Sequence, residues 1–167
     1  MIHLCFADET QADTIAQIIQ ESYKEQALML KMNAASHPNF AGFESGERVH
    51  ARLHAGDHAI LFFSDAKAIG TISYQVAPES SEVGYIKRFG ILPAYRRQGY
   101  GQVLMNHAEQ GLQALGVSRA EISIVAQFEP LRRYYEDMGY QVFKWDTVSS
   151  LPFEIAFLVK SLSESGV

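Results

Sequence analysis

Residues 91–110 read ILPAYRRQGYGQVLMNHAEQ and place two glycines, Gly99 and Gly101, between a strand-like run and a helix-like run. Pro93 ends the strand, and apolar residues after Gly101 recur at helical spacing, so a helix begins at about Gly99. The first amides of a helix lack intrahelical acceptors and lie at the positive end of the helix dipole, so this turn attracts anions. Because glycine has no Cβ, a diphosphate can approach the backbone closely, and two arginines add local positive charge. The stretch predicts a pyrophosphate-binding turn.

The chain has 167 residues, of which 47% are hydrophobic and 20% are charged, as is typical of one globular domain. We therefore expect a single domain over residues 1–167. The net charge of −5 disfavours nucleic acid as a partner, because the surface as a whole repels phosphate. The only cysteine, Cys5, excludes an intramolecular disulfide and a multi-cysteine metal site and indicates a reducing compartment. No apolar run approaches the ~18 residues that a membrane span requires, so we expect a cytoplasmic protein without a membrane partner.

Hydrophobic periodicity predicts an α/β fold, a mixed and mainly antiparallel sheet flanked by helices, in the order β-α-α-β-β-β-α-β-α-β-β. The strands 58–64, 68–76 and 83–91 follow one another with short turns between them, so we expect successive antiparallel neighbours. The other expected strands are 2–6, 120–126, 140–145 and 153–159, with a turn at Ser149-Ser150-Leu151-Pro152 between the last two. The expected helices begin after Asp8 or Thr10, after Ser45, at about Gly99 and at Pro130, and the last three end at Gly56, Gly116 and Gly139.

Three known anion-binding patterns compete for the glycine stretch. The P-loop pattern fails because no lysine follows Gly101. The dinucleotide fingerprint Gly-x-Gly-x-x-Gly is met only in its first two glycines, because Leu104 occupies the third position. Glu121 lies about twenty residues on, but at the start of its strand, whereas a ribose-binding acid belongs at the carboxyl end. The third pattern, Gln/Arg-x-x-Gly-x-Gly/Ala, is filled at every required position by Arg96, Gly99 and Gly101.

This third pattern, preceded by Ile91-Leu92-Pro93, resembles motif A of the GNAT family of N-acetyltransferases. The later stretch YYEDMGYQ resembles the family's Tyr-Glu-x-x-Gly-Phe/Tyr segment through Tyr135, Glu136, Gly139 and Tyr140. Two motifs in the family's order outweigh the simpler interpretation of one glycine motif as a capped turn. The resemblance is specific from about Val83 to Tyr140 and, with the order of the elements, extends over about Ile2 to Leu162.

The resemblance implies acetyl-CoA as the donor, with its pyrophosphate on the amides of Gln98, Gly99 and Gly101 and its pantetheine along the strand end at 89–91. Acetyl transfer to an amine passes through a tetrahedral oxyanion, and a backbone amide of 89–91 is the natural donor to it. Gly90 suggests a strand irregularity that turns an amide outward, and it equally fits a plain bulge. The expected cofactor-binding residues are Phe89, Gly90, Ile91, Arg96, Arg97, Gln98, Gly99, Tyr100 and Gly101.

The resemblance also implies a tyrosine that protonates the departing CoA thiolate, and Tyr135 occupies its position. A phenol with an ordinary pKa near ~10 is protonated at neutral pH, so it can donate without special tuning. Tyr134 points elsewhere on a helix, and we expect it to have a packing role. Some relatives use a glutamate before motif A as the base. Tyr85 stands at that place and is the second catalytic candidate, while Glu82 falls on the opposite strand face by alternation.

Other features leave alternatives open. The base could also be Glu25, Glu44, Glu47, His50 or water. The asparagine that the family often carries before the catalytic tyrosine is Phe128 here, with Gln127 or Glu129 as substitutes toward the pantetheine. His50, His54 and His58 recur every four residues, which invites a metal site. Gly56 should end the helix before His58, so we expect a solvated or substrate-lining face and no metal cofactor.

The expected activity is acetyl transfer to a primary amine on a small molecule or a peptide. Peptide N-termini, lysines, polyamines and aminoglycoside-like amines all remain open. The segment His37-Pro38-Asn39-Phe40 either walls an acceptor pocket or orders a loop. From a different class, a CoA-binding sensor would retain the glycine stretch without depending on Tyr135, and a dinucleotide-binding protein is the weakest alternative. Family members are often dimers, so a homodimer is a further expectation of the resemblance.

Overall fold

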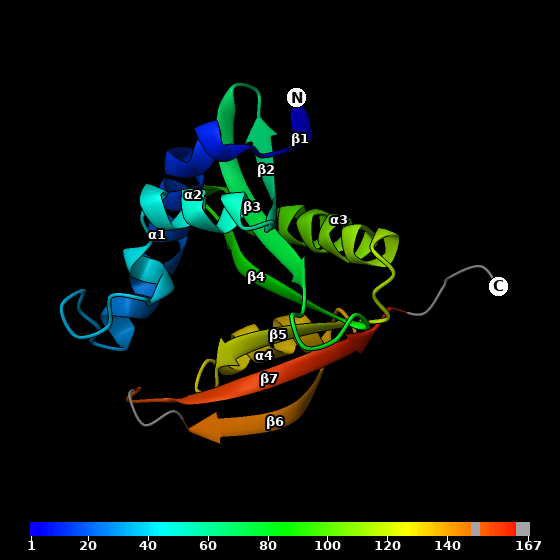
Figure 1. The fold of residues 1–167 in the computed structure, drawn as a ribbon. Helices are drawn as coiled ribbons and strands as arrows, with labels where there is room; N and C mark the ends of the chain where they lie inside the picture. The colour runs from blue at the N-terminus through cyan, green and yellow to red at the C-terminus, as the bar shows by residue number, and fades with distance from the viewer. Residues whose placement is uncertain (148–150, 163–167) are drawn as a thin grey trace. The chain divides into compact units, whose positions relative to one another are not determined.

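The computed structural model describes residues 1–147 and 151–162, and in them the predicted order of strands and helices is confirmed (Figure 1). The elements are β1 (Ile2–Phe6), α1 (Ala12–Met29), α2 (Gly46–His54), β2 (His58–Ser64), β3 (Lys67–Val76), β4 (Val83–Ile91), α3 (Tyr100–Ala114), β5 (Arg119–Val125), α4 (Glu129–Glu136), β6 (Gln141–Thr147) and β7 (Glu154–Ser161). Short 3-10 turns at Glu9–Gln11, Ala41–Phe43 and Pro93–Tyr95 come shortly before α1, α2 and α3. Of the predicted turn before β7, Ser149 and Ser150 lie outside the described residues.

The strands form one mixed sheet in the order β1-β2-β3-β4-β5-β7-β6. The pairs β1–β2, β2–β3, β5–β7 and β6–β7 are antiparallel, whereas β4 and β5 are parallel. A parallel pair requires a crossover connection, and α3 lies in the connection between β4 and β5. The mixed, mainly antiparallel sheet with flanking helices confirms the predicted fold class.

The chain divides into two compact units. Unit 1 comprises Met1–Gln75 and Arg88–Ala108, and unit 2 comprises Val76–Lys87 and Glu109–Val167. The division passes through β4 and α3, so each unit contains part of both elements. That residues 1–167 form a single domain stays a prediction.

In unit 1, α1 and α2 share an apolar core with β2. Ile15 and Ile19 of α1, Val49 of α2 and Leu61 of β2 belong to this core, and none is more than 3% exposed. The spacing of four residues between Ile15 and Ile19 places both on the same side of α1. Each such buried side chain contributes about 1.5–3 kcal/mol. This packing fixes α1 and α2 against the sheet.

Side-chain caps set where the first two helices begin. The Asp8 carboxylate accepts a hydrogen bond from the Thr10 amide at 2.9 Å, and Asp8 forms a capping box with Gln11. Asp8 is therefore the cap of the 3-10 turn that leads into α1. The Ser45 hydroxyl accepts from the Arg48 amide at 3.2 Å, which confirms Ser45 as the cap of α2.

A glycine contact sets the position of the first part of α3 in unit 1. A Cβ added to Gly70 of β3 would lie 2.6 Å from Cδ1 of Ile91 and 3.2 Å from Cδ1 of Leu104. Leu104 is fully buried on α3. The absence of a side chain at Gly70 lets α3 and the end of β4 approach β3 closely, which positions the turn that joins them.

Unit 2 contains a buried carboxylate with two partners. The Glu109 carboxylate accepts a hydrogen bond from the Tyr140 hydroxyl at 2.8 Å and contacts Nζ of Lys160 at 3.0 Å. Burial and the neighbouring Glu109 charge raise the pKa of Tyr140 from its ordinary value of 10.0, so Tyr140 stays a donor at neutral pH. The network ties β7 and the segment after α4 to α3.

Replacing Tyr140 with phenylalanine should lower the free energy of unfolding by about 1.5–3 kcal/mol, the usual contribution of a hydrogen bond to a charged group. The ring would remain packed, and Glu109 would keep Lys160 as its partner. Because the pKa of Tyr140 is raised, the contribution should be complete below pH 10.0 and should decline as the pH rises above that value. Thermal or urea denaturation at several pH values measures both effects.

The matched control for this variant is Tyr134→Phe, because Tyr134 is 39% exposed. We expect its unfolding free energy to equal that of the wild type within about 0.5 kcal/mol. Equal stability of the Tyr140 and Tyr134 variants would contradict the importance of the hydrogen bond to Glu109.

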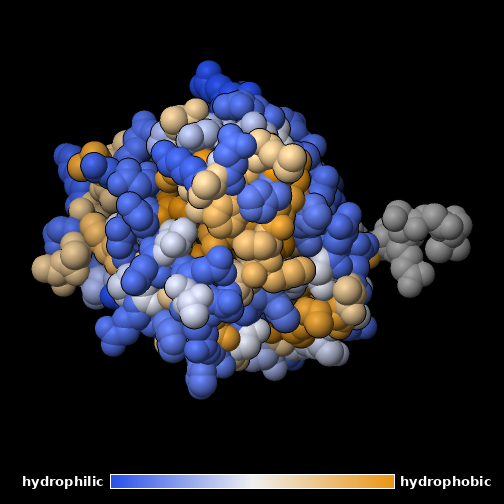
Figure 2. Space-filling model, turned by 90° about the horizontal axis from the view of Figure 1, so that it is seen from above, coloured by the Kyte–Doolittle hydropathy of each residue, from blue (hydrophilic) through white to orange (hydrophobic). Residues whose placement is uncertain are grey.

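The surface is mixed in polarity. On the face drawn in Figure 2, hydrophilic side chains surround a central apolar area. Large apolar side chains are exposed on β6 and at the end of α1: Phe143, Trp145, Leu28 and Met29. No helix within the described residues combines the length and apolar character that crossing a bilayer requires.

Candidate active site

The turn between β4 and α3 has the backbone geometry of an anion-binding turn. α3 begins at Tyr100, and the residue before it, Gly99, has a φ of 82°. A Cβ added to Gly99 would meet no atom of the described residues within 4 Å, so the space beside this backbone is open. Arg97 is also left-handed, with a φ of 63°, and turns of this kind can point successive amides toward one anion. The Tyr100 ring packs against Phe62 with centroids 5.0 Å apart, which anchors the start of α3.

The two arginines of this turn have different surroundings. Arg96 donates from Nε to the Ile91 carbonyl at 3.1 Å and from Nη2 to the Ser22 carbonyl at 3.0 Å. It therefore links α1 to the end of β4. Arg97 is exposed. Arg96 is exposed as well, so the two differ in that Arg96 already donates two hydrogen bonds inside unit 1.

The end of β4 is irregular, with a left-handed residue at Arg88, two positions before Gly90. Arg88 has a φ of 51° in the middle of a strand. The Tyr23 hydroxyl donates to the Phe89 carbonyl at 2.9 Å, and desolvation raises the pKa of Tyr23, so this donor remains protonated. A Cβ added to Gly90 would lie 2.6 Å from both Cβ and Oγ of Ser22. Gly90 is thus required for close packing of β4 on α1.

Glu44, one of the candidate bases, is an enclosed anchor. Its side chain is 0% exposed, and Oε2 contacts Nε of Arg88 at 3.1 Å and also pairs with Nη2 of Arg52. The other oxygen, Oε1, accepts from the Ser45 amide at 3.2 Å. Because both carboxylate oxygens are engaged, the geometry disfavours Glu44 as a proton acceptor. Two further candidates, Glu25 and Glu47, are exposed.

The Tyr-Glu-x-x-Gly segment comprises the last two residues of α4, Tyr135 and Glu136, and the turn after them, in unit 2. Tyr135 is 7% exposed, whereas Tyr134 is 39% exposed, so the two tyrosines occupy different sides of α4, as predicted. Their rings meet edge to face with centroids 5.4 Å apart. Tyr135 also meets the Tyr140 ring at 6.1 Å, and Tyr140 is held by Glu109. Burial raises the pKa of Tyr134. Tyr135 is therefore held in a defined aromatic cluster.

Tyr85, the second catalytic candidate, lies in the part of β4 that belongs to unit 2. It is partly buried and stands in register with Glu121 of β5. Glu82 lies just before β4 rather than on its opposite face, because the strand begins at Val83. The Glu82 carbonyl accepts from the amides of Ser118 and Arg119, each at 3.0 Å.

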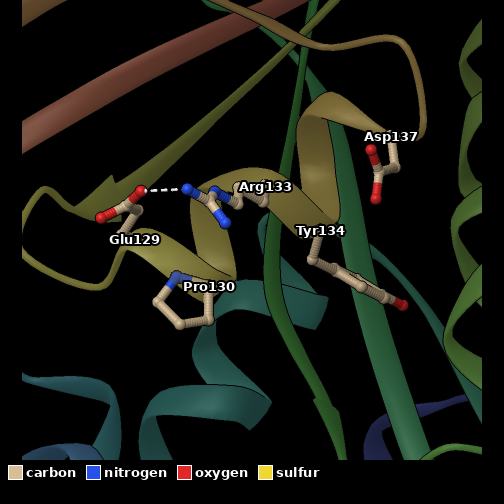
Figure 3. Close-up of a pocket in the computed structure, with 5 residues that line it drawn as sticks. All are labelled: Glu129, Pro130, Arg133, Tyr134 and Asp137. Atoms are coloured by element: carbon tan, nitrogen blue, oxygen red, sulfur yellow. Dashed lines mark hydrogen bonds and ion pairs between the residues drawn. The ribbon is translucent and has the colours of Figure 1, made fainter.

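An open hollow of about 520 Å³ lies beside α4 (Figure 3). Its lining residues are Glu129, Pro130, Arg133, Tyr134 and Asp137. Arg133 and Glu129 form an ion pair at 2.6 Å across one turn of the helix. The hollow contains none of the residues expected to bind the cofactor or to act in catalysis.

The three histidines at four-residue spacing do not form one group. Nε2 of His50 and Nδ1 of His54 contact the two oxygens of Glu9, at 3.2 and 3.0 Å. His58 instead stacks on Tyr74 in the sheet, with centroids 5.0 Å apart. Gly56, with a φ of 108°, follows the end of α2 and separates the pair from His58, as predicted. Within residues 1–147 and 151–162, no group of three or more histidine, cysteine, aspartate or glutamate side chains could hold a metal ion.

The predicted site residues fall in both units. All the expected cofactor-binding residues, Phe89 to Ile91 and Arg96 to Gly101, belong to unit 1, and Tyr85 and Tyr135 belong to unit 2. The sequence did not reveal the contacts of Tyr23 and Glu44 with the end of β4. In the sequence, Tyr23 was only one of the apolar residues at helical spacing, and Glu44 was one of several candidate bases. No local pattern indicated either contact.

Residues 14–140 match the family model described as Acetyltransferase (GNAT) family. No curated protein sequence matches the chain. Among solved structures, the fold is similar to that of the ribosomal-protein-S18-alanine N-acetyltransferase from Escherichia coli, with 15% identity, a TM-score of 0.76, and coverage of 99% of this chain and 97% of that chain. It is also similar to PaiA N-acetyltransferase from Thermoplasma acidophilum in complex with coenzyme A, with 17% identity, a TM-score of 0.77, and coverage of 96% and 99%. The family match spans most of the chain, and the chain therefore belongs to the GNAT acetyltransferase family.

Proposed function

We propose that this protein is a cytoplasmic N-acetyltransferase that moves the acetyl group of acetyl-CoA to an amine by direct attack. The observation that carries the proposal is the turn before α3, where Gly99 has a φ of 82° and open space at its Cβ position. A glycine in this conformation at a helix N-terminus lets an anionic diphosphate reach the backbone amides. The residues present therefore fit the phosphate part of acetyl-CoA.

The remaining parts of the donor would lie along the chain that leads into this turn. The amides of Gln98, Gly99 and Gly101 would hold the pyrophosphate, and Arg97 would add charge from solvent. The pantetheine would follow the strand end at 89–91, as the family resemblance implies. A backbone amide of 89–91 would donate to the oxyanion that forms on the thioester carbonyl.

The chemistry requires two proton movements. The amine nitrogen attacks the carbonyl carbon of the thioester, and the C–S bond breaks as the tetrahedral intermediate collapses. Tyr135 would give its hydroxyl proton to the CoA thiolate, and the nitrogen would lose a proton to water or to a side chain at the Tyr85 position. The support for Tyr135 is its place in the Tyr-Glu-x-x-Gly segment and its fixed position among aromatic rings.

The acceptor class proposed is a primary amine, on a small molecule or a peptide. The E. coli protein of similar fold acts on an alanine of a ribosomal protein, as its name states, but at 15% identity this likeness supports the fold alone. The net charge of −5 favours encounter with cationic amines, and it affects encounter rates more than specificity.

Calorimetric titration with acetyl-CoA, with NADH as the competing ligand, tests the proposal. We expect saturable binding of acetyl-CoA and no binding of NADH. A screen of amines for release of free CoA thiol should then identify turnover. Binding without turnover on any amine would favour a CoA sensor, and binding of NADH alone would favour a dinucleotide-binding protein.

A further inference from the structure

We propose that Arg88 is a positioning residue for acetyl transfer, because its ion pair with the enclosed Glu44 holds the end of β4 in a bent conformation. In that conformation a backbone amide of 89–91 points toward the thioester carbonyl of acetyl-CoA. This inference rests on the proposed function and adds two residues, Arg88 and Glu44, that would control the oxyanion donor without touching the substrate.

The backbone at Arg88 is unusual for a strand. Its φ is 51°, in the left-handed region that non-glycine residues adopt rarely and at a cost. Neighbouring residues of β4 continue the strand on both sides. One left-handed residue within a strand rotates the peptide groups next to it and changes where their amides point. Since arginine gains nothing from this backbone conformation, its surroundings must supply the restraint, and the Arg88 side chain provides one part of it.

That restraint is a buried carboxylate. Nε of Arg88 lies 3.1 Å from Oε2 of Glu44, whose side chain is 0% exposed, and Nη2 of Arg88 donates to the Asn39 carbonyl at 3.4 Å. Both partners belong to the segment between α1 and α2, far from Arg88 in the chain. Opening this pair would take one of two cationic partners from an enclosed carboxylate, so the pair resists opening. The side chain of Arg88 is thereby fixed at its far end.

Three contacts restrain the residues that follow Arg88. Tyr23 donates to the Phe89 carbonyl at 2.9 Å, and Ser22 packs so closely that only glycine fits at position 90. Arg96 holds the Ile91 carbonyl at 3.1 Å. The segment after the bend is therefore bound to α1 at successive residues, while Arg88 itself is bound to Glu44. This many restraints on one short stretch exceed what strand pairing requires, and they coincide with the proposed oxyanion donor.

The segment between α1 and α2 gains a role from this arrangement. It contains Asn39, within the stretch that either walls an acceptor pocket or orders a loop, and Glu44. Through these two residues the segment sets the conformation of β4. Holding the bend of β4 is thus a sufficient function for the segment between α1 and α2, whether or not this segment also contacts the acceptor.

Infrared difference spectroscopy of acetyl-CoA labelled with ¹³C at the thioester carbonyl tests the inference without a known acceptor. A hydrogen bond to the carbonyl lowers its stretching frequency relative to free acetyl-CoA. We expect the lowered band in the wild-type protein and its return toward the free position in Arg88→Ala. Arg88→Lys, which retains a cation toward Glu44, should restore part of the shift.

With an amine found by screening, Arg88→Ala should also reduce kcat by about 100-fold, the usual effect of losing one oxyanion donor, while acetyl-CoA affinity changes little.

Controls separate positioning from folding. In Arg88→Ala the buried Glu44 keeps Arg52 as its partner, so the carboxylate is not orphaned. Arg88→Gly is the second variant, because glycine adopts this φ without strain and should fold where alanine does not. Lys31→Ala is matched for the backbone, since Lys31 has a φ of 54° and is exposed at the end of α1; it should retain the wild-type band.

The outcomes distinguish this inference from the proposed function. If the wild-type protein binds no acetyl-CoA, the proposed function and this inference both fail. If it binds acetyl-CoA but folded Arg88→Ala and Arg88→Gly keep the wild-type carbonyl band, only the positioning role of Arg88 is overturned.

Discussion

Replacing Gly99 with valine should weaken acetyl-CoA binding by about 100-fold. The variant places a branched side chain in the open space beside the turn and keeps the diphosphate away from the backbone amides. Loss of one hydrogen bond to a charged group, about 1.5–3 kcal/mol, corresponds to roughly ten- to hundredfold weaker binding, and valine should displace more than one. Calorimetric titration with acetyl-CoA measures the change directly.

The backbone strain of this substitution can be matched closely. Gly116, after the end of α3, has a φ of 85°, against 82° at Gly99, and at both positions an added Cβ would meet no described atom within 4 Å. Gly116→Val should therefore lose similar stability, about 1–3 kcal/mol, and keep wild-type affinity. Equal affinity of the two valine variants would show that the turn at Gly99 does not hold the phosphates.

The strands of the sheet were predicted closely because their signals are local. Runs of β-forming residues bounded by turn residues gave 58–64 and 83–91, which are the bounds of β2 and β4. The end of α1 was less predictable. The helix continues to Met29, and Lys31 after it has a φ of 54°. A lysine therefore occupies the left-handed position, where a glycine would have indicated the end of the helix. A stop without glycine or proline leaves no signal in the sequence.

The features of the site also differ in whether they depend on local sequence or on distant partners. Anion binding at a helix start depends on neighbouring residues, so the stretch Arg96–Gly101 could be found from spacing. The bend of β4 depends on partners far apart in the chain, since Tyr23 and Phe89 are separated by 66 residues. Glu44 also gave no hint of being enclosed by arginines, because charge pairing across a fold is not encoded by periodicity. Gly90 suggested an irregularity, but the left-handed residue is Arg88, two positions earlier.

Replacing Tyr135 with phenylalanine should reduce kcat by about 100- to 10,000-fold, the usual contribution of a general acid, with acetyl-CoA affinity nearly unchanged. The thiolate would then leave without a proton from the enzyme. The substitution keeps the ring, so the edge contacts with Tyr134 and Tyr140 should persist and the fold should be retained. Release of CoA thiol with an amine substrate measures kcat, and titration measures affinity.

Tyr134→Phe is the matched control, because it removes a hydroxyl from the next residue of the same helix, on a side chain that is 39% exposed against 7% for Tyr135. It should turn over at the wild-type rate. A large loss in the Tyr134 variant with none in the Tyr135 variant would reverse the assignment of the acid. Wild-type turnover in both would mean that solvent protonates the thiolate, and the Tyr-Glu-x-x-Gly segment would then serve packing alone. A loss of turnover in the Tyr135 variant alone is the result that fits Tyr135 as the acid. It would show that position on α4 decides the role, since both residues are tyrosines.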